Sequence, residues 1–497
     1  MPASLLGMPE RWTLHHIVGD STATCLDGSA PAFYVRPPVA TAGQSSTKFA
    51  IFLEGGGWCV SEQDCLGRMH DGQGSSAPYK AHVGTPGSGG GYFDAPTPLG
   101  AEFSDATVVF VKYCDASSFA GDASHTFVAR KDLRLGHRLV KAGAPISIRW
   151  AGRPIVDAML SQLLRDFGLA TATDVLLSGC SAGGLAALLV AETVRHKIRE
   201  SGAPLRRFKV LVLSGVFHHA SPYAEQMREL DRFANVSASI APSCARRFAA
   251  GDRWRCLVGL EPLHALPPDI PAFLEQSAFD RWQTACVLGA AASRFELVGC
   301  SAAGGWDQCL HFTEPFTPAG ALPARIRRSA CSKPQLRSLE RFQSEFMAEL
   351  RASHALQRPG YGAFLHGCHS HCPTNLRRFA IGGVALETAV LNWWRGVPVE
   401  PSAVPSAALQ SASHVHTGCL TSWATFHNES LERPPPGARR RQPQGASRLA
   451  ACTPTCSPLY AWPDQRAAYR RRAQAIELAL RGAITSPELI VKTPRPA

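Results

Sequence analysis

The chain has 497 residues, of which 45% are hydrophobic, and a formal net charge of +12 at pH 7. This length can bury one large core or two ordinary ones, and no window approaches the ~18 consecutive apolar residues that a membrane-spanning helix needs. We therefore expect neither a membrane-spanning segment nor a membrane partner.

The positive charge favours contact with a polyanion, although part of it lies in the basic runs "ARRRQ" and "YRRRAQ" near the C-terminus. There is no zinc-finger spacing, no ribonucleoprotein motif and no basic stripe interleaved with aromatic residues, so we expect no nucleic-acid partner.

The cysteine content bears on the compartment. Sixteen cysteines, several in tight pairs such as Cys59 with Cys65, favour an oxidising compartment and a secreted protein. The alternative is reduced cysteines packed as small apolar side chains. The start, "MPASLLGMPERWTL", contains no readable signal peptide, which a true start upstream of Met1 would reconcile with secretion. Asn235 and Asn428 stand in glycosylation sequons, which adds the expectation of a glycoprotein.

Strand and helix signals alternate in the first half of the chain. Residues 48–57 and 106–114 are predicted to be buried strands. A helix is predicted over 153–168, with Pro154 in its first turn and Gly168 at its C-terminal cap. A strand at 173–179, a helix at 184–200 and a strand at 207–216 follow. This order predicts an α/β protein with an α/β-hydrolase-like, doubly wound, mostly parallel sheet and long loops.

Composition divides the chain. The Gly- and Pro-rich segment 66–100 is predicted to be a long loop that shapes a site or is disordered. Beyond about residue 400 the sequence becomes rich in Pro, Ser and Arg, so we place a domain boundary there. We expect residues 1–400 to form the α/β domain, and residues 401–497 to form a poorly ordered, low-complexity tail with a short helix near 464–482.

The segment Gly179-Cys180-Ser181-Ala182-Gly183 matches the G-x-S-x-G nucleophile elbow, with an apolar strand before it and a helix after it. The elbow projects only its central residue into the site, so Ser181 is predicted to be the nucleophile and Cys180 to be packed or in a disulfide. A second Cys-Ser pair ends at Ser301 but lacks the glycine two residues on and the amphipathic helix, so we interpret it as a loop.

An attacking serine needs N–H donors for the oxyanion. Ala182 supplies one. In "LEGGGWC" at 53–59, Gly57 and Trp58 can aim their backbone N–H groups because the glycines before them let the chain fold tightly. Glu54 is interpreted as holding this loop. No metal or organic cofactor is needed for such chemistry.

The usual order of a hydrolase triad, Ser, acid, His, directs the search to residues after Ser181. Asp280 in "IPAFLEQSAFDRW" comes just past a predicted strand, where a sheet delivers an orienting carboxylate. Residue chemistry does not separate His366, His369 and His371.

Eight stretches, in this order along residues 12–398, resemble the pectin acetylesterases of plants, whose relatives include the animal Wnt deacylase Notum. The stretches are "CLDGSAPAFY", "LEGGGWC", "YCDASSFAGD", "LSGCSAGGL", "SAFDRWQ", "GGWDQC", "CSKPQLRSLERFQSEF" and "CHSHC". The chain departs from the family at "GCHSHCP", where the plant proteins have "SCFAHCQ", and at "SGVFH", in place of "DAGFF".

The resemblance implies a triad of Ser181, Asp280 and His371, and an oxyanion hole formed by Gly57, Trp58 and Ala182. It also implies secretion and disulfides, for which we expect Cys25 with Cys114 and Cys59 with Cys65.

The expected function is therefore that of a monomeric serine esterase that removes O-acetyl groups from pectin or a related acidic cell-wall polysaccharide through an acyl-serine. Two alternatives stay open: a Notum-like lipid deacylase, which needs a deep apolar pocket, and a catalytically inactive polysaccharide-binding protein.

Overall fold

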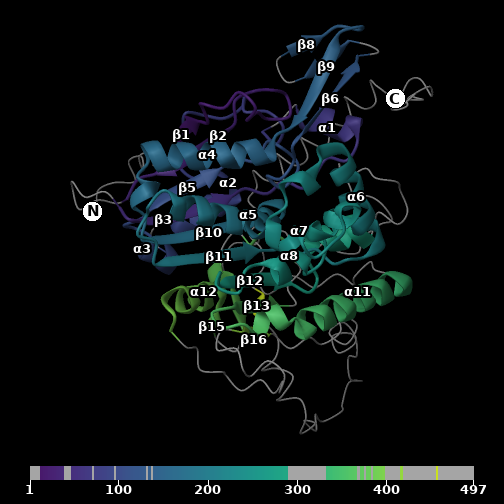
Figure 1. Cartoon of the computed structure of the whole chain (residues 1–497). Coiled ribbons are helices and arrows are strands. Elements are labelled where there is room, and N and C mark those ends of the chain that lie inside the picture. Colours follow the sequence, from purple (N-terminus) through teal and green to yellow (C-terminus); the bar gives the residue numbers. More distant parts are fainter. Residues whose placement is uncertain are drawn as a thin grey trace, which may run out of the picture. The chain divides into compact units, whose positions relative to one another are not determined.

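The computed structural model of the chain describes residues 12–38, 46–69, 72–94, 97–129, 132–135, 138–288, 332–366, 370–373, 376–381, 384–397, 415–417 and 455–456 (Figure 1). The chain divides into two units, Met1–Cys456 and Ser457–Ala497. All of the described residues belong to the first unit.

A ten-stranded sheet forms the centre of the described part, in the order β16-β13-β12-β11-β10-β3-β5-β2-β1-β4. Neighbouring strands from β16 to β5 are parallel, whereas β2, β1 and β4 complete the other edge as antiparallel strands. The strands of this sheet are β1 (Trp12–His16), β2 (Ala32–Arg36), β3 (Lys48–Leu53), β4 (His82–Val83), β5 (Thr107–Val111), β10 (Asp174–Cys180), β11 (Arg207–Leu213), β12 (Ala272–Ser277), β13 (Gly362–His366) and β16 (Val415–Thr417). The predicted α/β, mostly parallel sheet is confirmed.

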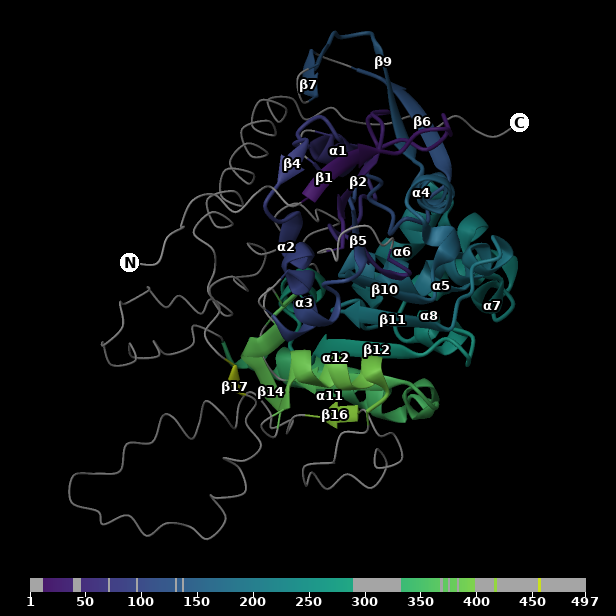
Figure 2. The ribbon, with the colours of Figure 1, turned by 90° about the vertical axis from the view of Figure 1, so that its left-hand side faces the viewer.

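Helices cover both faces of this sheet, which is why its central strands are continuous apolar runs. In β3, Phe49, Ile51 and Leu53 pack into the cluster on one face, whereas Ala50 and Phe52 pack into the cluster on the other. As Figure 2 shows, α4 (Gly152–Asp166), α5 (Ala182–Glu200) and α8 (Glu261–Ala265) lie on the first face, and α3 (Pro98–Glu102) and α12 (Leu386–Arg395) lie on the second.

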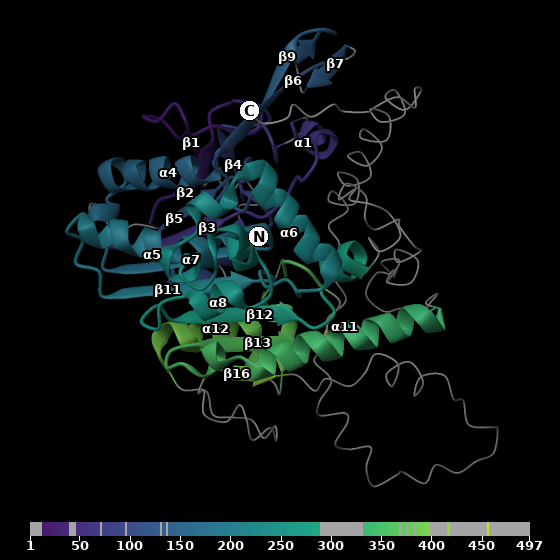
Figure 3. The ribbon, with the colours of Figure 1, turned by 45° about the vertical axis from the view of Figure 1, so that its right-hand side comes forward.

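The long helices begin and end where local sequence signals place them. Pro154 lies in the first turn of α4, and Gly168 follows its C-terminal cap at φ +79°, a conformation that glycine adopts at little cost. The helix α11 (Lys333–Ala352), green in Figure 3, starts with a capping box of Ser332 and Gln335. Its residues Leu339, Phe342 and Phe346 pack into the cluster on the first face.

The remaining helices and strands are at most 14 residues long. The helices are α1 (Glu62–Arg68), α2 (Gly87–Gly90), α6 (Ser221–Ala234), α7 (Pro242–Ala245) and α9 (Arg281–Gln283). Three small sheets pair β6 (Ala123–Val128) with β9 (Pro145–Trp150), β7 (Leu133–Leu135) with β8 (Arg138–Val140), and β14 (Phe379–Ile381) with β15 (Val384–Ala385) and β17 (Thr455–Cys456). Among the described residues, no helix is long and apolar enough to cross a bilayer.

The structure tests the predicted loop at 66–100 but does not test the predicted domain boundary at residue 400. The predicted loop 66–100 contains α2 and α3, and its Tyr92, Phe93 and Leu99 are buried in the cluster on the second face. The domain boundary at residue 400 stays a prediction. The strands β16 and β17 lie beyond it, whereas the helix expected near 464–482 lies outside the described residues.

Candidate active site

Ser181 lies in a sharp turn between β10 and α5, with φ +59° and ψ −130°. A non-glycine residue is strained in this region, and such strain is typical of a nucleophile elbow. The turn forces close backbone contact: a Cβ atom on Gly183 would lie 2.1 Å from the carbonyl oxygen of Leu53. The glycines of the motif are therefore required by packing, and the predicted strand, turn and helix are confirmed.

The imidazole of His371 connects Ser181 to Asp280. Its Nε2 lies 2.8 Å from Ser181 Oγ, and its Nδ1 lies 2.8 Å from Asp280 Oδ2. Because an ionised carboxylate only accepts, Nδ1 carries the hydrogen, which leaves Nε2 to accept from the serine hydroxyl. This arrangement can remove the hydroxyl proton of Ser181.

Asp280 reaches this position because β12 ends three residues earlier at the same edge of the sheet as β10. Its carboxylate is completely buried. The Oδ1 atom accepts the backbone N–H of Gln283 at 2.9 Å, which caps the short helix α9. The cap restricts the carboxylate to one orientation toward His371.

Geometry separates two of the three candidate histidines, His366 and His371. His366 is completely buried, and its Nε2 lies 2.8 Å from Glu275 Oε1. His369 lies outside the described residues, as does Ser301, the serine of the second Cys-Ser pair. Among the described residues, His371 is the histidine that contacts Ser181.

A disulfide joins the two segments that carry Ser181 and His371. Cys180 bonds to Cys372, so the residue before Ser181 is joined to the residue after His371. This confirms that Cys180 is a structural residue. The expected pairs of Cys25 with Cys114 and Cys59 with Cys65 are also present, together with a pair that was not predicted, Cys244 with Cys256.

A buried polar network supports the same loop. Ser214, the first residue of the "SGVFH" departure, follows β11 and accepts the backbone N–H of Cys372 at 3.1 Å. Glu275 accepts both the N–H and the hydroxyl of Ser214, at 3.0 and 3.2 Å, and bonds His366 on its other oxygen. At the "SGVFH" departure, Ser214 therefore contributes to the packing behind His371.

The glycine-rich loop after β3 lies against the elbow. A Cβ atom on Gly55 would lie 2.2 Å from the carbonyl oxygen of Cys180, so only glycine allows this approach. Within the described residues, the backbone N–H groups of Gly57, Trp58 and Ala182 donate to no other group. These three donors are therefore available to a ligand.

The interpretation of Glu54 as a residue that holds this loop is confirmed. Its Oε1 accepts from Lys112 Nζ at 2.7 Å, and its Oε2 accepts the backbone N–H of Tyr113 at 3.0 Å. The hydroxyl of Tyr113 in turn donates to the carbonyl oxygen of Gly57 at 2.6 Å.

Sequence reasoning missed Arg68. Its guanidinium is buried and donates to the carbonyl oxygens of Gly56 and Trp58, at 2.6 and 2.9 Å. These two hydrogen bonds fix the orientation of planar peptide groups in the loop, and therefore the directions of the N–H groups in the same planes. No sequence signal assigns Arg68 this contact, because a backbone carbonyl can be reached by many donors.

Sequence reasoning also missed the turn that Asp115 organises. Asp115 Oδ2 accepts from the N–H of Ser117 and of Phe119, at 3.1 and 3.0 Å, and complete burial raises the pKa of this carboxyl to about 6. The turn presents the hydroxyl of Ser118, which accepts the indole N–H of Trp58 at 2.8 Å. The motif "YCDASSFAGD" therefore helps to place Trp58, a role that its residue types do not indicate.

Aromatic rings form a wall beside the imidazole. The ring centroids of Phe217 and Trp282 lie 6.4 and 6.2 Å from that of His371. Trp58 packs edge-on against Phe217, Tyr223 and Trp282. Of this wall, Trp282 is only partly buried. Trp282 therefore supplies the accessible apolar surface of this wall, beside His371.

Three residues of the described part bring potential metal-ligating atoms within 4.8 Å of one another, namely His218, His219 and Glu349. Glu349 already bonds the Nδ1 of His219 at 3.0 Å, and the Nδ1 of His218 accepts the N–H of Ala220 at 3.1 Å. Burial lowers the pKa of His218 to about 4, so its ring is neutral with the hydrogen on Nε2. Because the Nδ1 atoms of both histidines are engaged and Nε2 of His218 carries a hydrogen, this cluster is not arranged to bind a metal ion.

Comparison with known proteins adds to this geometry. Residues 10–394 match the family model described as Pectinacetylesterase. Pectin acetylesterase 7 of Arabidopsis thaliana is 26% identical over 382 residues, which cover 75% of this chain and 84% of that protein. Human palmitoleoyl-protein carboxylesterase NOTUM is 25% identical over 284 residues, which cover 54% of this chain and 51% of that protein.

Among solved structures, the Wnt deacylase Notum from Drosophila superposes with a TM-score of 0.54 at 20% sequence identity. The match covers 78% of this chain and 93% of that one. At this identity the likeness demonstrates a shared fold.

Proposed function

The chain belongs to the pectinacetylesterase family and is a carboxylic ester hydrolase, and we propose that it removes O-acetyl groups from pectin or a related acidic cell-wall polysaccharide. In this proposal Ser181 is the nucleophile, His371 the general base and acid, and Asp280 the residue that orients the imidazole. The observation that carries it is the continuous hydrogen-bonded chain from Asp280 through His371 to Ser181, at 2.8 Å in each step.

The reaction proceeds by two acyl transfers. Ser181 Oγ attacks the ester carbonyl carbon while His371 Nε2 takes the hydroxyl proton. The tetrahedral intermediate then collapses, the bond to the sugar oxygen breaks, and Nε2 returns the proton to that oxygen. A water molecule attacks the acyl-serine in the same way, and acetate leaves as Ser181 recovers its proton.

The oxyanion of each tetrahedral intermediate is assigned to the backbone N–H groups of Gly57, Trp58 and Ala182. The available donors and the carbonyls held by Arg68 support this assignment, because fixed dipoles stabilise developing charge without reorganising. Ala182 also begins the 19-residue helix α5, whose N-terminal dipole favours negative charge.

Two features support an acetylated, acidic polymer as the substrate. The net charge of +12 favours a polyanion over a neutral one. Trp282, the partly exposed ring of the aromatic wall, offers contact to a small apolar acyl group, and the buried rings of Trp58 and Phe217 support it from behind. The relatives named pectin acetylesterase point the same way.

An extracellular location fits the disulfides, since such bonds persist in oxidising compartments. Asn235 is exposed at the end of α6, where a glycan could be attached, whereas Asn428 lies outside the described residues. We propose a secreted enzyme that acts as a monomer.

The test is the release of acetate from acetylated pectin by the wild-type protein and by Ser181→Ala. Hydrolysis of p-nitrophenyl acetate and of p-nitrophenyl palmitate is measured beside it, together with labelling by a fluorophosphonate. We expect acetate release, a preference for the acetyl ester, and labelling that disappears in Ser181→Ala.

Other results would contradict parts of the proposal. A preference for the palmitoyl ester, with no acetate released from pectin, would favour a lipid deacylase. Fluorophosphonate labelling of both proteins would contradict the assignment of Ser181 and indicate another nucleophile. Labelling of neither protein would favour a binding protein without activity.

A further inference from the structure

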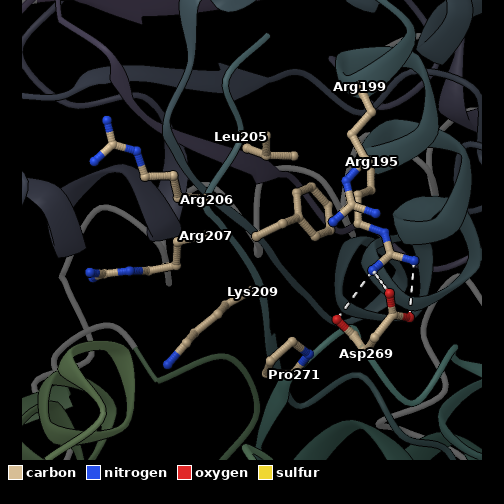
Figure 4. Close-up of a pocket in the computed structure, with 9 residues that line it drawn as sticks. Arg195, Arg199, Leu205, Arg206, Arg207, Lys209, Asp269 and Pro271 are labelled. Atoms are coloured by element: carbon tan, nitrogen blue, oxygen red, sulfur yellow. Dashed lines mark hydrogen bonds and ion pairs between the residues drawn. The ribbon is translucent and has the colours of Figure 1, made fainter. Parts of the chain in front are cut away.

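A second feature of the surface is a pocket of about 180 Å³ with a strongly basic lining. Its charged residues are five cations and one carboxylate, Arg195, Arg199, Arg206, Arg207, Lys209 and Asp269 (Figure 4). Such an excess of one charge in a hollow focuses the electrostatic field and concentrates counter-ions there.

The pocket lies at the opposite edge of the sheet from Ser181. Arg207 begins β11, and Pro271 directly precedes β12, so both mark the N-terminal ends of parallel strands. Ser181 and Asp280 instead follow the C-terminal ends of β10 and β12. Because a strand rises ~3.3 Å per residue, the seven residues of β11 separate the two edges by about 20 Å.

Some of the positive charge is neutralised within the protein. Arg195 forms two hydrogen bonds with the carboxylate of Asp269, at 2.7 and 3.1 Å, and Arg207 pairs with Asp174 at 3.1 Å. Arg199 and Arg206 are exposed and form no ion pair with any residue that the structure describes. These two guanidinium groups are therefore available to an external anion.

Lys209 adds a cation that no carboxylate neutralises within the described part of the chain. Its Nζ donates to the carbonyl oxygens of Trp393 and Trp394, at 2.6 and 3.1 Å. Burial, together with the neighbouring charge of Arg207, lowers the pKa of Lys209 to about 8. An anion in the pocket would relieve this crowding of positive charge.

The arrangement suits an extended ligand. Leu205, Phe208 and Pro271 line the pocket as its apolar residues. In Figure 4, Arg195 and Arg199 of α5 lie on one side of Leu205 and Pro271, whereas Arg206, Arg207 and Lys209 extend to the other side from the start of β11. A sugar chain has apolar ring faces, and a polyuronate carries its carboxylates at intervals along the chain.

We propose that this pocket binds a stretch of a polyuronate chain and so holds the polymer at a distance from the catalytic serine. The inference rests on the proposed function, which makes an acidic polysaccharide the substrate. Two sites on one polymer raise the effective concentration of ester groups at Ser181 without a change in the chemistry there. A small ester cannot use this effect.

The test compares two variants with the same change in net charge. Arg199→Glu with Arg206→Glu reverses the two exposed cations of the pocket that form no ion pair with a described residue. The control, Lys141→Glu with Arg232→Glu, reverses two exposed cations outside the pocket, Lys141 directly after β8 and Arg232 on α6, and loss of their surface ion pairs changes stability little. Retention by de-esterified polygalacturonate is measured by affinity electrophoresis, with dextran as the neutral polymer and double-stranded DNA as a second polyanion.

We expect the pocket variant to bind polygalacturonate about tenfold more weakly than the wild type and its KM for acetylated pectin to rise, while kcat/KM for p-nitrophenyl acetate stays unchanged. The control variant should behave as the wild type does. Equal losses in the two variants, or no loss in either, would overturn the inference, as would equal retention by dextran or tighter binding of DNA than of polygalacturonate.

The same measurements separate this inference from the proposed function. A wild-type protein that binds polygalacturonate through Arg199 and Arg206 but releases no acetate supports the pocket and contradicts the function. Acetate release without any retention by polygalacturonate overturns the pocket alone.

Discussion

Removal of the disulfide between Cys180 and Cys372 should weaken both the fold and the catalytic step. The bond joins the elbow that carries Ser181 to the loop that carries His371, across 192 residues of chain. The change is Cys180→Ala with Cys372→Ala. The matched control is Cys244→Ala with Cys256→Ala, which removes a bond between residues only 12 apart.

The magnitude follows from the length of the loop that each bond closes. In the chain-entropy treatment, a bond across 192 residues contributes about 5 kcal/mol to the free energy of unfolding. A bond across 12 residues contributes about 3 kcal/mol. We therefore expect the first variant to lose about 2 to 3 kcal/mol more than the control in denaturant unfolding followed by circular dichroism.

The two disulfides should also differ in their effect on catalytic activity. His371 is held on one side by Cys372, whose N–H donates to Ser214 and whose sulfur is bonded to Cys180. Without the bond the imidazole can move by a fraction of an ångström, and such misplacement costs about 10 to 100-fold in kcat. The control variant joins no catalytic loop, so its kcat for p-nitrophenyl acetate should match that of the wild type.

Two results would refute this reasoning. Equal losses of stability in both variants would mean that loop length does not set the contribution of these bonds. An unchanged kcat in the Cys180 and Cys372 variant would mean that His371 is positioned by its other contacts, which are the bond to Asp280 and the network behind Ser214.

Three further changes test the site and its support. Asp280→Asn should keep the cap on α9 but lower kcat about 10⁴-fold, because an amide does not hold the imidazole of His371 in the right tautomer; a kcat within tenfold of wild type would contradict the orienting role. Gly183→Ala should destabilise the fold by about 1 to 3 kcal/mol through its clash with a backbone carbonyl, whereas Gly67→Ala, which meets nothing within 4 Å, should not; thermal unfolding of both variants decides this. Burial raises the pKa of Asp115 from 3.8 to about 6, so the folded state binds the proton more tightly and the free energy of unfolding should fall by about 3 kcal/mol between about pH 4 and pH 6. Asp115→Asn should lack that fall, and parallel pH profiles for the two proteins would contradict the assignment.

The central strands of the sheet could be predicted from the sequence, because apolar runs with turn residues at their ends are a local signal. The strands predicted at 48–57, 106–114 and 173–179 appear as β3, β5 and β10. The order of strands, and the antiparallel edge formed by β2, β1 and β4, depend on contacts between distant segments. No local pattern contains that information.

The residues of the candidate site also differ in whether a local sequence signal identifies them. Ser181 was found from residues alone because its elbow needs glycines at fixed positions, and those positions are contiguous in the sequence. His371 lies 190 residues later, where His366 and His369 offer the same chemistry. The resemblance to the pectin acetylesterases indicates His371. The structure gives a physical reason to exclude His366, which is buried and bonded to Glu275.

Arg68 and Asp115, which support the site, could not be predicted from the sequence even when the triad is known. The reason is that both residues bond backbone groups. A nucleophile, a base and an orienting acid must each be one of a few residue types, so a sequence narrows the candidates. Arg68 instead holds backbone carbonyls, and Asp115 holds backbone N–H groups, which every residue of the chain offers. Because their partners carry no signature of residue type, only the folded positions of Gly56, Trp58 and Phe119 identify these contacts.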